Sequence, residues 1–174
     1  VGKACESGVN AAVLALKGLQ GAPDILENEW GFSKVIAGNS AIPVLKNKLG
    51  NPFDVESPGF VLKQYPSCAG THPALDAILE LKKEYNLIPE KIKAVECGSD
   101  QQTLDMLKYS RPQTPLQGKF SMQYCIAAAL VDGELSLEHF TDAKIKNRSI
   151  RSLLRKITLC LDKKIAQKGY SSKS

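Results

Sequence analysis

A lysine and a histidine flank a loop of small residues, and together they form the strongest chemical pattern in the sequence. The run is Lys63-Gln-Tyr-Pro-Ser-Cys-Ala-Gly-Thr-His-Pro-Ala-Leu-Asp76. Pro73 suits the first turn of a helix, so Thr71 or His72 is the expected cap, and threonine is the better one chemically. The positive end of such a helix favours a small anion, and an ammonium and an imidazole add to that preference. The pattern leaves two interpretations open, a carboxylate- or phosphate-binding corner and an ordinary strand–loop–helix connection.

The other candidates for chemistry are few. Cys68 lies near the expected helix start, where a thiolate is favoured, but no third residue is evident to orient a Cys68–His72 pair. His139, the second of two histidines, is predicted to be a surface or structural residue. Tyr124 stands in an apolar segment, and a buried phenol usually needs a partner for its hydroxyl. No carboxylate pair, metal-ligand spacing or glycine-rich phosphate motif is evident, so the residues alone predict an anion site without a reaction.

Composition predicts a globular protein with a core of its own. The 174 residues are 43% hydrophobic and 24% charged, and no apolar run is long enough to cross a bilayer. The five cysteines are widely separated and include no Cys-x-x-Cys pair, which argues against a zinc site or a disulfide framework and fits a reducing compartment. The net charge of +5 comes from scattered lysines, which indicates a solvated basic surface and makes nucleic-acid binding a minority alternative.

Helical patterns dominate the first part of the chain. A helix rich in small residues is predicted over 3–16, and a second helix is predicted from Asp24 to Ala37. A short helical or irregular piece follows at 42–49. Segment 50–59 carries two prolines and two glycines without periodicity, which is typical of a linker.

After the linker, helices alternate with strands. The predicted strands are 60–65, 92–97 and 157–161. The predicted helices are 73–85 with Asn86 as C-cap, 101–107, 120–131 with Ser121 as N-cap, and 148–156 with Asn147 as N-cap. This pattern predicts an α+β two-layer domain over 56–162, preceded by the tail of an all-helical domain over 1–55 and followed by a polar tail over 163–174. Because the chain starts at Val1 directly in a helical pattern, we expect it to be a piece of a longer protein.

The run from Lys63 to Asp76 resembles a signature of the MmgE/PrpD family, which includes 2-methylcitrate dehydratase, cis-aconitate decarboxylase and iminodisuccinate epimerase. Two further segments match in the expected order. Residues 8–21 resemble the helix and turn that precede the family's lid domain, and residues 120–133 resemble a later lid helix. Segment 147–156 also fits the lid, so the resemblance covers most of the chain.

The resemblance implies an active-site cleft between a large helical domain and a smaller α+β lid, in a dimeric enzyme without a metal or organic cofactor. By resemblance, Lys63 contacts a substrate carboxylate, with Thr71 and Cys68 beside it as substrate-binding residues. Tyr124 and His72 are the implied catalytic residues, with the Tyr124 phenol as donor or proton-transfer partner. Such donors suit the negative charge that develops next to a carboxylate when a proton or carbon dioxide is lost.

Two positions depart from the family pattern. Glu6 stands where some relatives carry a lysine, and Cys68 stands where the family's decarboxylases carry a histidine, which favours other branches. The predicted function is therefore part of a hydro-lyase similar to 2-methylcitrate dehydratase, with a cis-aconitate decarboxylase or an epimerase as alternatives. A non-catalytic anion- or partner-binding module is the alternative from another class. The expected partners are a small polycarboxylic acid and a second copy in a homodimer, with no nucleic acid or membrane, in the cytoplasm or a mitochondrial matrix.

Overall fold

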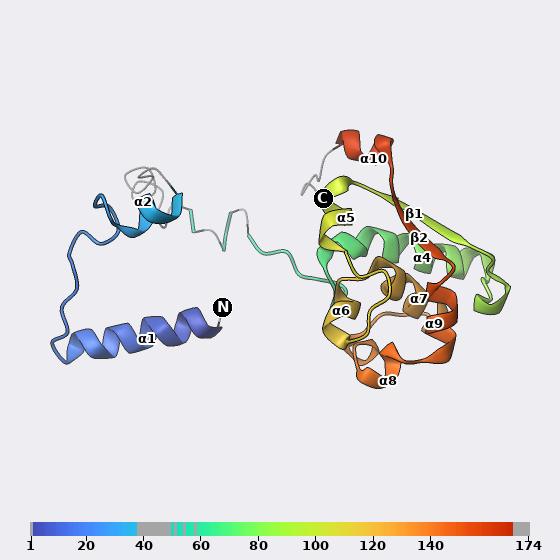
Figure 1. Cartoon of the computed structure of the whole chain (residues 1–174), viewed down its shortest axis with the longest axis horizontal. Helices are drawn as coiled ribbons and strands as arrows, with labels where there is room; N and C mark the ends of the chain where they lie inside the picture. Colours follow the sequence, from blue (N-terminus) through green and yellow to red (C-terminus); the bar gives the residue numbers. More distant parts are fainter. Residues whose placement is uncertain (1, 38–49, 51, 54, 58, 169–174) are drawn as a thin grey trace. The chain divides into compact units, whose positions relative to one another are not determined.

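The computed structural model describes residues 2–37, 50, 52–53, 55–57 and 59–168 (Figure 1). The chain divides into two compact units, Val1–Val61 and Leu62–Ser174, which are described separately. The predicted domain limits at 55 and 162 stay predictions. In the described residues no helix is both long and apolar enough to span a bilayer.

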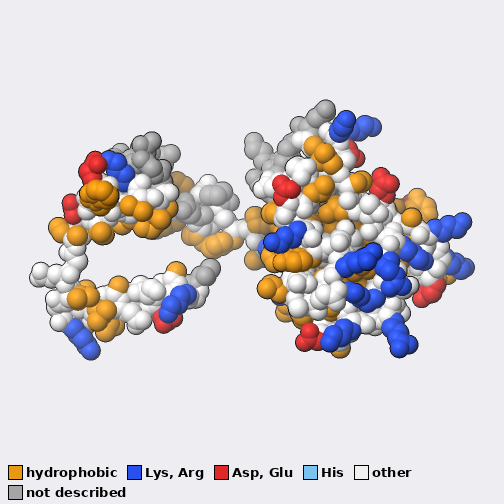
Figure 2. Space-filling model, in the orientation of Figure 1, with side chains coloured by type: hydrophobic (Ala, Val, Ile, Leu, Met, Phe, Trp, Pro, Cys, Tyr) orange, Lys and Arg blue, Asp and Glu red, His pale blue; other side chains and the backbone are white. Residues whose placement is uncertain are grey.

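The first unit contains helices α1 (Gly2–Leu16) and α2 (Phe32–Ala37). The helix predicted over 3–16 is confirmed, and its side chains are exposed in this structure, with Val9 64% accessible. Figure 2 accordingly shows hydrophobic side chains on the surface of this unit. A helix with apolar residues nearly all round is typical of burial, yet α1 has no buried residue and no packing partner among the described residues of its own unit.

The helix predicted from Asp24 is wrong over its first part, because 23–31 forms turns and only α2 is helical. Phe32 N–H donates to the Ile25 carbonyl at 2.8 Å, so the chain folds back on itself instead of continuing along a helix axis. Gly31 allows this return, since a Cβ there would lie 2.6 Å from the Ile25 oxygen. The piece predicted at 42–49 lies outside the described residues.

The second unit combines helices with a small parallel sheet. Its helices are α4 (His72–Tyr85), α5 (Gln101–Met106), α6 (Pro115–Lys119), α7 (Met122–Asp132), α8 (Asp142–Ile145), α9 (Arg148–Leu154) and α10 (Lys163–Lys168). Short 3-10 turns are η1 (Ala69–Thr71), η2 (Pro89–Lys91) and η3 (Leu137–His139). Strands β1 (Val95–Ser99) and β2 (Ile157–Leu161) pair in parallel, from Val95 opposite Ile157 to Ser99 opposite Leu161. The predicted α+β class is confirmed.

Helix α7 lies at the centre of this unit, and every residue from Met122 to Leu130 is buried. It packs against α4, α9 and β2, and its run of small residues lets those elements approach closely. The predicted N-cap is confirmed, since Ser121 Oγ accepts from Tyr124 N–H at 3.1 Å. The predicted helices with caps at Asn86 and Asn147 are confirmed as α4 and α9.

Three predicted elements of this unit need correction. No strand forms over 60–65, because Phe60, Val61 and Leu62 are 81%, 94% and 91% exposed and pair with no described strand. The strand predicted over 92–97 forms instead over Val95–Ser99, because only these residues pair with β2, although Ile92 already has an extended backbone. The predicted polar tail contains α10, whose first turn is capped by Asp162 Oδ1, which accepts from Lys164 N–H at 2.7 Å.

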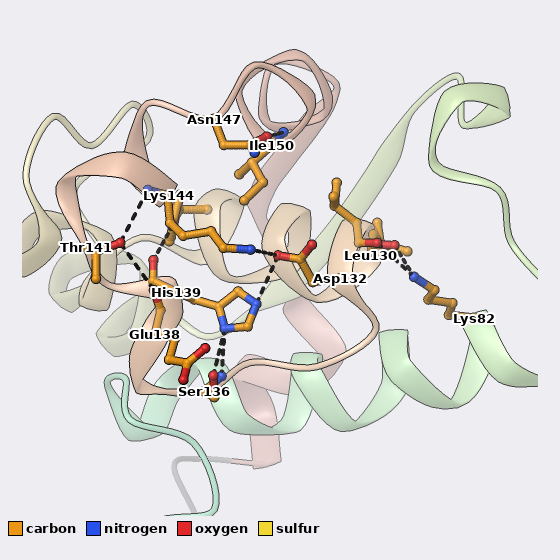
Figure 3. Close-up of polar contacts among 12 residues, drawn as sticks. Lys82, Leu130, Asp132, Ser136, Glu138, His139, Thr141, Lys144, Asn147 and Ile150 are labelled. Atoms are coloured by element: carbon orange, nitrogen blue, oxygen red, sulfur yellow. Dashed lines mark hydrogen bonds and ion pairs between the residues drawn. The ribbon is translucent and has the colours of Figure 1, made fainter.

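Replacing Gly133 by alanine is expected to destabilise the second unit by about 1 kcal/mol, because Gly133 ends α7 in the left-handed conformation at φ 82°. The same helix end is held by Lys82, whose ammonium donates to the Leu130 carbonyl (Figure 3). Urea unfolding followed by circular dichroism measures the difference. Gly133→Asn is the matched control and should lower the free energy of unfolding less than Gly133→Ala does. Asparagine tolerates the left-handed conformation, as Asn86 does at φ 48°. Equal losses for the two variants would contradict this account.

Candidate anion-binding site

In the loop before α4, the side chain of Lys63 folds back onto the backbone of the same loop. Lys63 is exposed, and its ammonium donates to the Ser67 carbonyl at 3.2 Å. The loop is anchored to the core by Cys68, whose backbone N–H donates to the Lys119 carbonyl at 2.9 Å. A cation therefore stands over a fixed loop that leads directly into the start of α4.

Thr71 occupies the N-cap position of α4, as predicted, but its hydroxyl does not cap the helix. The hydroxyl donates instead to the Cys68 carbonyl at 2.8 Å and lies 2.7 Å from Ser67 Oγ. Both side chains are buried, so they brace the loop from inside. As a consequence, no side chain caps the N-terminus of α4, and its positive end is not neutralised by a side-chain cap.

His72 packs against Tyr65, and Tyr65 is in turn hydrogen-bonded to Asp76. The rings of Tyr65 and His72 meet edge to face with centroids 5.2 Å apart, and the Tyr65 hydroxyl donates to Asp76 Oδ1 at 2.6 Å. Burial of Tyr65 and its bond to Asp76 raise the pKa of the phenol to about 12. His72 Nε2 is buried and has no hydrogen-bond partner among the described residues. Asp76 follows His72 by four residues on one face of α4, a spacing that marks it as a neighbour of the ring, although its hydrogen bond goes to Tyr65 and not to His72.

The α7 residue that faces the loop is Cys125. Its thiol donates to the Gly118 carbonyl at 3.5 Å. Burial raises the pKa of this thiol to about 12, although hydrogen bonds with Ser67 and Thr71 act in the opposite direction. Cys125 therefore stays a protonated, small packing residue beneath the loop, while Cys68 is only half-buried.

Tyr124 lies away from this loop. Its side chain is fully buried, its ring stands 5.9 Å from that of Phe140, and its hydroxyl donates to the His139 carbonyl. Burial raises the pKa of the phenol, with smaller contributions from Cys125 and Asp132. Among the described residues, Tyr124 makes no hydrogen bond to the loop. The structure thus brings together Lys63, Cys68, Thr71 and His72, and the catalytic role of Tyr124 stays a prediction.

His139, predicted to be surface or structural, is a buried structural residue with only 3% exposure. Its Nε2 lies 3.0 Å from Asp132 Oδ2, and Lys144 Nζ reaches the same oxygen at 2.7 Å (Figure 3). We call His139, Asp132, Lys144 and Ser136 the His139 cluster.

Acid is expected to weaken the second unit partly through Asp132. Its slight burial acts to raise the carboxyl pKa, but Lys144 and His139 outweigh this and lower the pKa below its ordinary value. A carboxyl with a lowered folded-state pKa stabilises the fold above the unfolded value of about 4, and this stabilisation is lost as pH falls through the folded value. In urea unfolding between pH 3 and 7, the free energy of unfolding should therefore fall less steeply with decreasing pH in Asp132→Asn than in the wild type. Glu138→Gln is the control and should retain the wild-type slope, whereas equal slopes for all three proteins would contradict the role of Asp132.

A shallow groove of about 590 Å³ lies where α4 and α7 end, and none of the predicted site residues lines it. Its lining residues are Leu79, Lys82, Lys83, Asn86, Leu87 and Gly133. In the residues that the structure describes, no group of three or more His, Cys, Asp and Glu side chains could hold a metal ion.

Comparison with known proteins assigns the chain to a family. The model of the MmgE/PrpD C-terminal domain matches residues 65–174, and that of the MmgE/PrpD N-terminal domain matches residues 1–44. The chain therefore belongs to the MmgE/PrpD family. It is similar to cis-aconitate decarboxylase of Homo sapiens, with 28% identity over 164 residues, and to that of Mus musculus, with 26% identity over 166 residues. Each alignment covers 91% of this chain but only 34% and 33% of the respective relative, so the chain spans about a third of their length.

Proposed function

We propose that the chain is the lid portion of a lyase that acts on a small di- or tricarboxylic acid. The observation that carries this proposal is the loop at the start of α4, which resembles the family's signature. No side chain caps the helix there, and Lys63 stands exposed. A carboxylate placed there gains an ammonium and a helix N-terminus together. Lys63 needs only to exchange the Ser67 carbonyl for the substrate, because it is otherwise in solvent.

His72 supplies a second contact in this proposal. Its Nε2 is buried and unpartnered among the described residues, and an orphan buried nitrogen gains free energy from a ligand that completes its hydrogen bonding. Tyr65 and Asp76 keep the ring in place through the edge-to-face contact and the hydroxyl bond. Thr71 and Cys68 shape the loop between the Lys63 ammonium and the His72 imidazole.

The proposed reaction removes a proton next to a carboxylate and expels water, as in a hydro-lyase similar to 2-methylcitrate dehydratase. A general base takes this proton, the electron pair of the C–H bond forms the new double bond, and the hydroxyl group leaves as water after a general acid protonates it. Negative charge grows on the adjacent carboxylate, and Lys63 stabilises that charge. Burial raises the pKa of Tyr124 and keeps its phenol protonated, which makes it unsuited to act as the base. Because its hydroxyl already donates to the His139 carbonyl, the proposal assigns Tyr124 no proton transfer to the substrate.

Decarboxylation of cis-aconitate is the second candidate, because both relatives named above are cis-aconitate decarboxylases. Loss of carbon dioxide also leaves negative charge next to a remaining carboxylate, so Lys63 and the N-terminus of α4 would stabilise that charge as well. Cys68 favours the hydro-lyase, since by resemblance the decarboxylases carry a histidine at that position.

A panel of acids tests both reactions in the protein expressed from its full natural reading frame. The panel contains 2-methylcitrate, citrate and cis-aconitate, and products are identified by nuclear magnetic resonance. Loss of water from 2-methylcitrate supports the first candidate, and carbon dioxide release from cis-aconitate supports the second. A folded protein that binds these acids without turning over any of them supports an anion-binding module and overturns the lyase.

A further inference from the structure

We propose that the outer side of α9 binds the phosphate backbone of a nucleic acid, whatever the base sequence. Four residues carry this inference, and we call them the arginine face: Arg111, Arg148, Arg151 and Arg155. The arginine face includes none of the residues assigned to the anion-binding site, so the inference does not rest on the proposed function.

The arginines of the chain are unevenly distributed. The sequence contains only four arginines, and all four belong to the arginine face. Segments 106–131 and 143–161, which supply them, contain no Asp or Glu. The scattered lysines led to the expectation that nucleic acid is not a partner, but the arginines are not scattered. Figure 2 shows basic side chains grouped on the visible face of the second unit.

Helix α9 has an apolar side and a basic side. The side chains that it buries in the core are Ile150, Leu153 and Leu154. With about 3.6 residues per turn, spacings of three and four residues place Arg148, Arg151 and Arg155 together on the opposite side. Arg148 and Arg155 are exposed, and Arg151 is half-buried. The core packing of α9 therefore fixes the side on which the arginines meet solvent.

A hydrogen bond brings Arg111 to the same surface. Arg151 Nη1 donates to the Pro112 carbonyl at 2.7 Å, so the residue after Arg111 lies against α9. Arg111 is exposed. In the part of the chain that the structure describes, no ion pair joins any of the four arginines to a carboxylate. Their positive charges can therefore pair with an anion from another molecule.

The length of the arginine row favours a repeated anion over a single small one. From Arg148 to Arg155 the helix rises by about 10 Å. One strand of a duplex carries a phosphate at about every 3.4 Å of its axis, so several phosphates fall within the row. A guanidinium group binds phosphate oxygens through two parallel hydrogen bonds. The exposed hydroxyl of Ser152, between the two arginines, adds a donor of a kind that often contacts phosphate.

The composition of this surface favours nucleic acid over a protein or a membrane. The exposed residues of segment 148–155 are Arg148, Ser149, Ser152 and Arg155. Protein–protein interfaces have an apolar core rich in aromatic residues, and helices that bind membranes bury an apolar side in the lipid. Interfaces with nucleic acid are more polar and more positively charged. The exposed side of α9 has this last composition.

Fluorescence anisotropy tests the proposal, with the 174-residue chain and labelled duplexes of DNA and of RNA, each of about 20 base pairs. Near physiological salt the dissociation constant should be about 1–100 μM, and two unrelated sequences should bind within about twofold. Binding to either duplex supports the proposal, and the tighter duplex identifies the source of the phosphates. Absence of binding to both duplexes, or a sequence preference above about tenfold, would overturn it.

Arg148→Gln/Arg155→Gln is the test variant, because both side chains are exposed and neither makes a contact that the fold needs. It should weaken binding about tenfold or more and lower the slope of log affinity against log salt by about 2, one for each lost phosphate contact. Arg148→Lys/Arg155→Lys keeps the charge and should keep the slope.

The matched control is Lys163→Gln/Lys164→Gln, which removes the same charge from exposed positions of α10. It should weaken binding less than about threefold, because salt screens charges that do not touch the phosphates. Equal losses of affinity in the two glutamine variants would overturn the role of the arginine face.

Two other polyanions separate nucleic acid from the remaining partners. They are polyglutamate with the same total charge as the duplex, and phosphatidylcholine vesicles with about 20% phosphatidylserine. Each should displace the duplex only weakly. Full displacement by polyglutamate would indicate an acidic protein, and tighter binding to the vesicles would indicate a membrane, and either result would overturn the proposal. None of these measurements uses turnover of an acid, so their failure leaves the proposed lyase intact, and failure of the lyase leaves this inference intact.

Discussion

Replacing Lys63 by methionine is expected to lower kcat/KM of the full-length protein about 10- to 100-fold towards its acid substrate. The variant removes the exposed ammonium at the start of α4 and keeps a side chain of similar length. A hydrogen bond to a charged group contributes about 1.5–3 kcal/mol, and each 1.4 kcal/mol corresponds to about tenfold. Because the proposed site places Lys63 against both the ground state and the charged transition state, KM should rise and kcat should fall together.

The matched control for this variant is Lys91→Met, which removes an exposed ammonium from η2 in the same unit. It should leave both kinetic constants within about twofold, since isolated surface charges contribute little. Steady-state kinetics with each acid of the panel measures both variants. Unchanged kcat/KM in Lys63→Met towards every substrate would remove Lys63 from the site.

Replacing Leu130 by alanine is expected to destabilise the second unit by about 2–5 kcal/mol. Leu130 is fully buried on α7, in the core that α4, α9 and β2 share. Truncation removes buried methyl groups and leaves a cavity, and both effects lower the free energy of unfolding. Urea unfolding of the 174-residue chain, followed by circular dichroism, measures the change.

Leu137→Ala is the control for this core variant, because Leu137 is 69% exposed on η3. Its effect should stay within about 0.5 kcal/mol. If the two variants lose the same stability, α7 is not the centre of a packed core.

Local chemistry in the sequence predicted α4, α5, α7 and α9 of the second unit, and missed the short helices α6, α8 and α10. The caps at Ser121 and Asn147 and the left-handed Asn86 belong to short motifs, and their hydrogen bonds involve neighbours within three or four residues. Such interactions are visible in a sequence because they depend on spacing along one chain.

Strands and long-range turns were harder to predict. The apolar run at Phe60–Leu62 has the composition of a strand, but a strand forms only where another strand pairs with it. Likewise, the segment before α2 has helical spacing, yet Gly31 lets the backbone return to Ile25. Both outcomes depend on contacts between backbone groups that are separated in the sequence. The spacing of apolar residues does not reveal such contacts.

The candidate site was predicted only in its loop. Lys63, Thr71 and His72 were found because a signature and a helix start coincide there. Tyr65 and Asp76 were missed, since their role depends on a ring contact and a hydroxyl bond across the corner. The Thr71 hydroxyl was assigned to the helix cap, whereas the structure directs it to the Cys68 carbonyl, where it competes successfully with capping.

We propose above that the start of α4 binds a carboxylate through Lys63. A crystal structure of the full-length protein with tricarballylate, a saturated tricarboxylate that cannot lose water, tests this claim most directly. The account predicts a carboxylate oxygen about 3 Å from Lys63 Nζ, at the N-terminus of α4 and beside His72. Tricarballylate bound elsewhere, with Lys63 still on the Ser67 carbonyl, would contradict it.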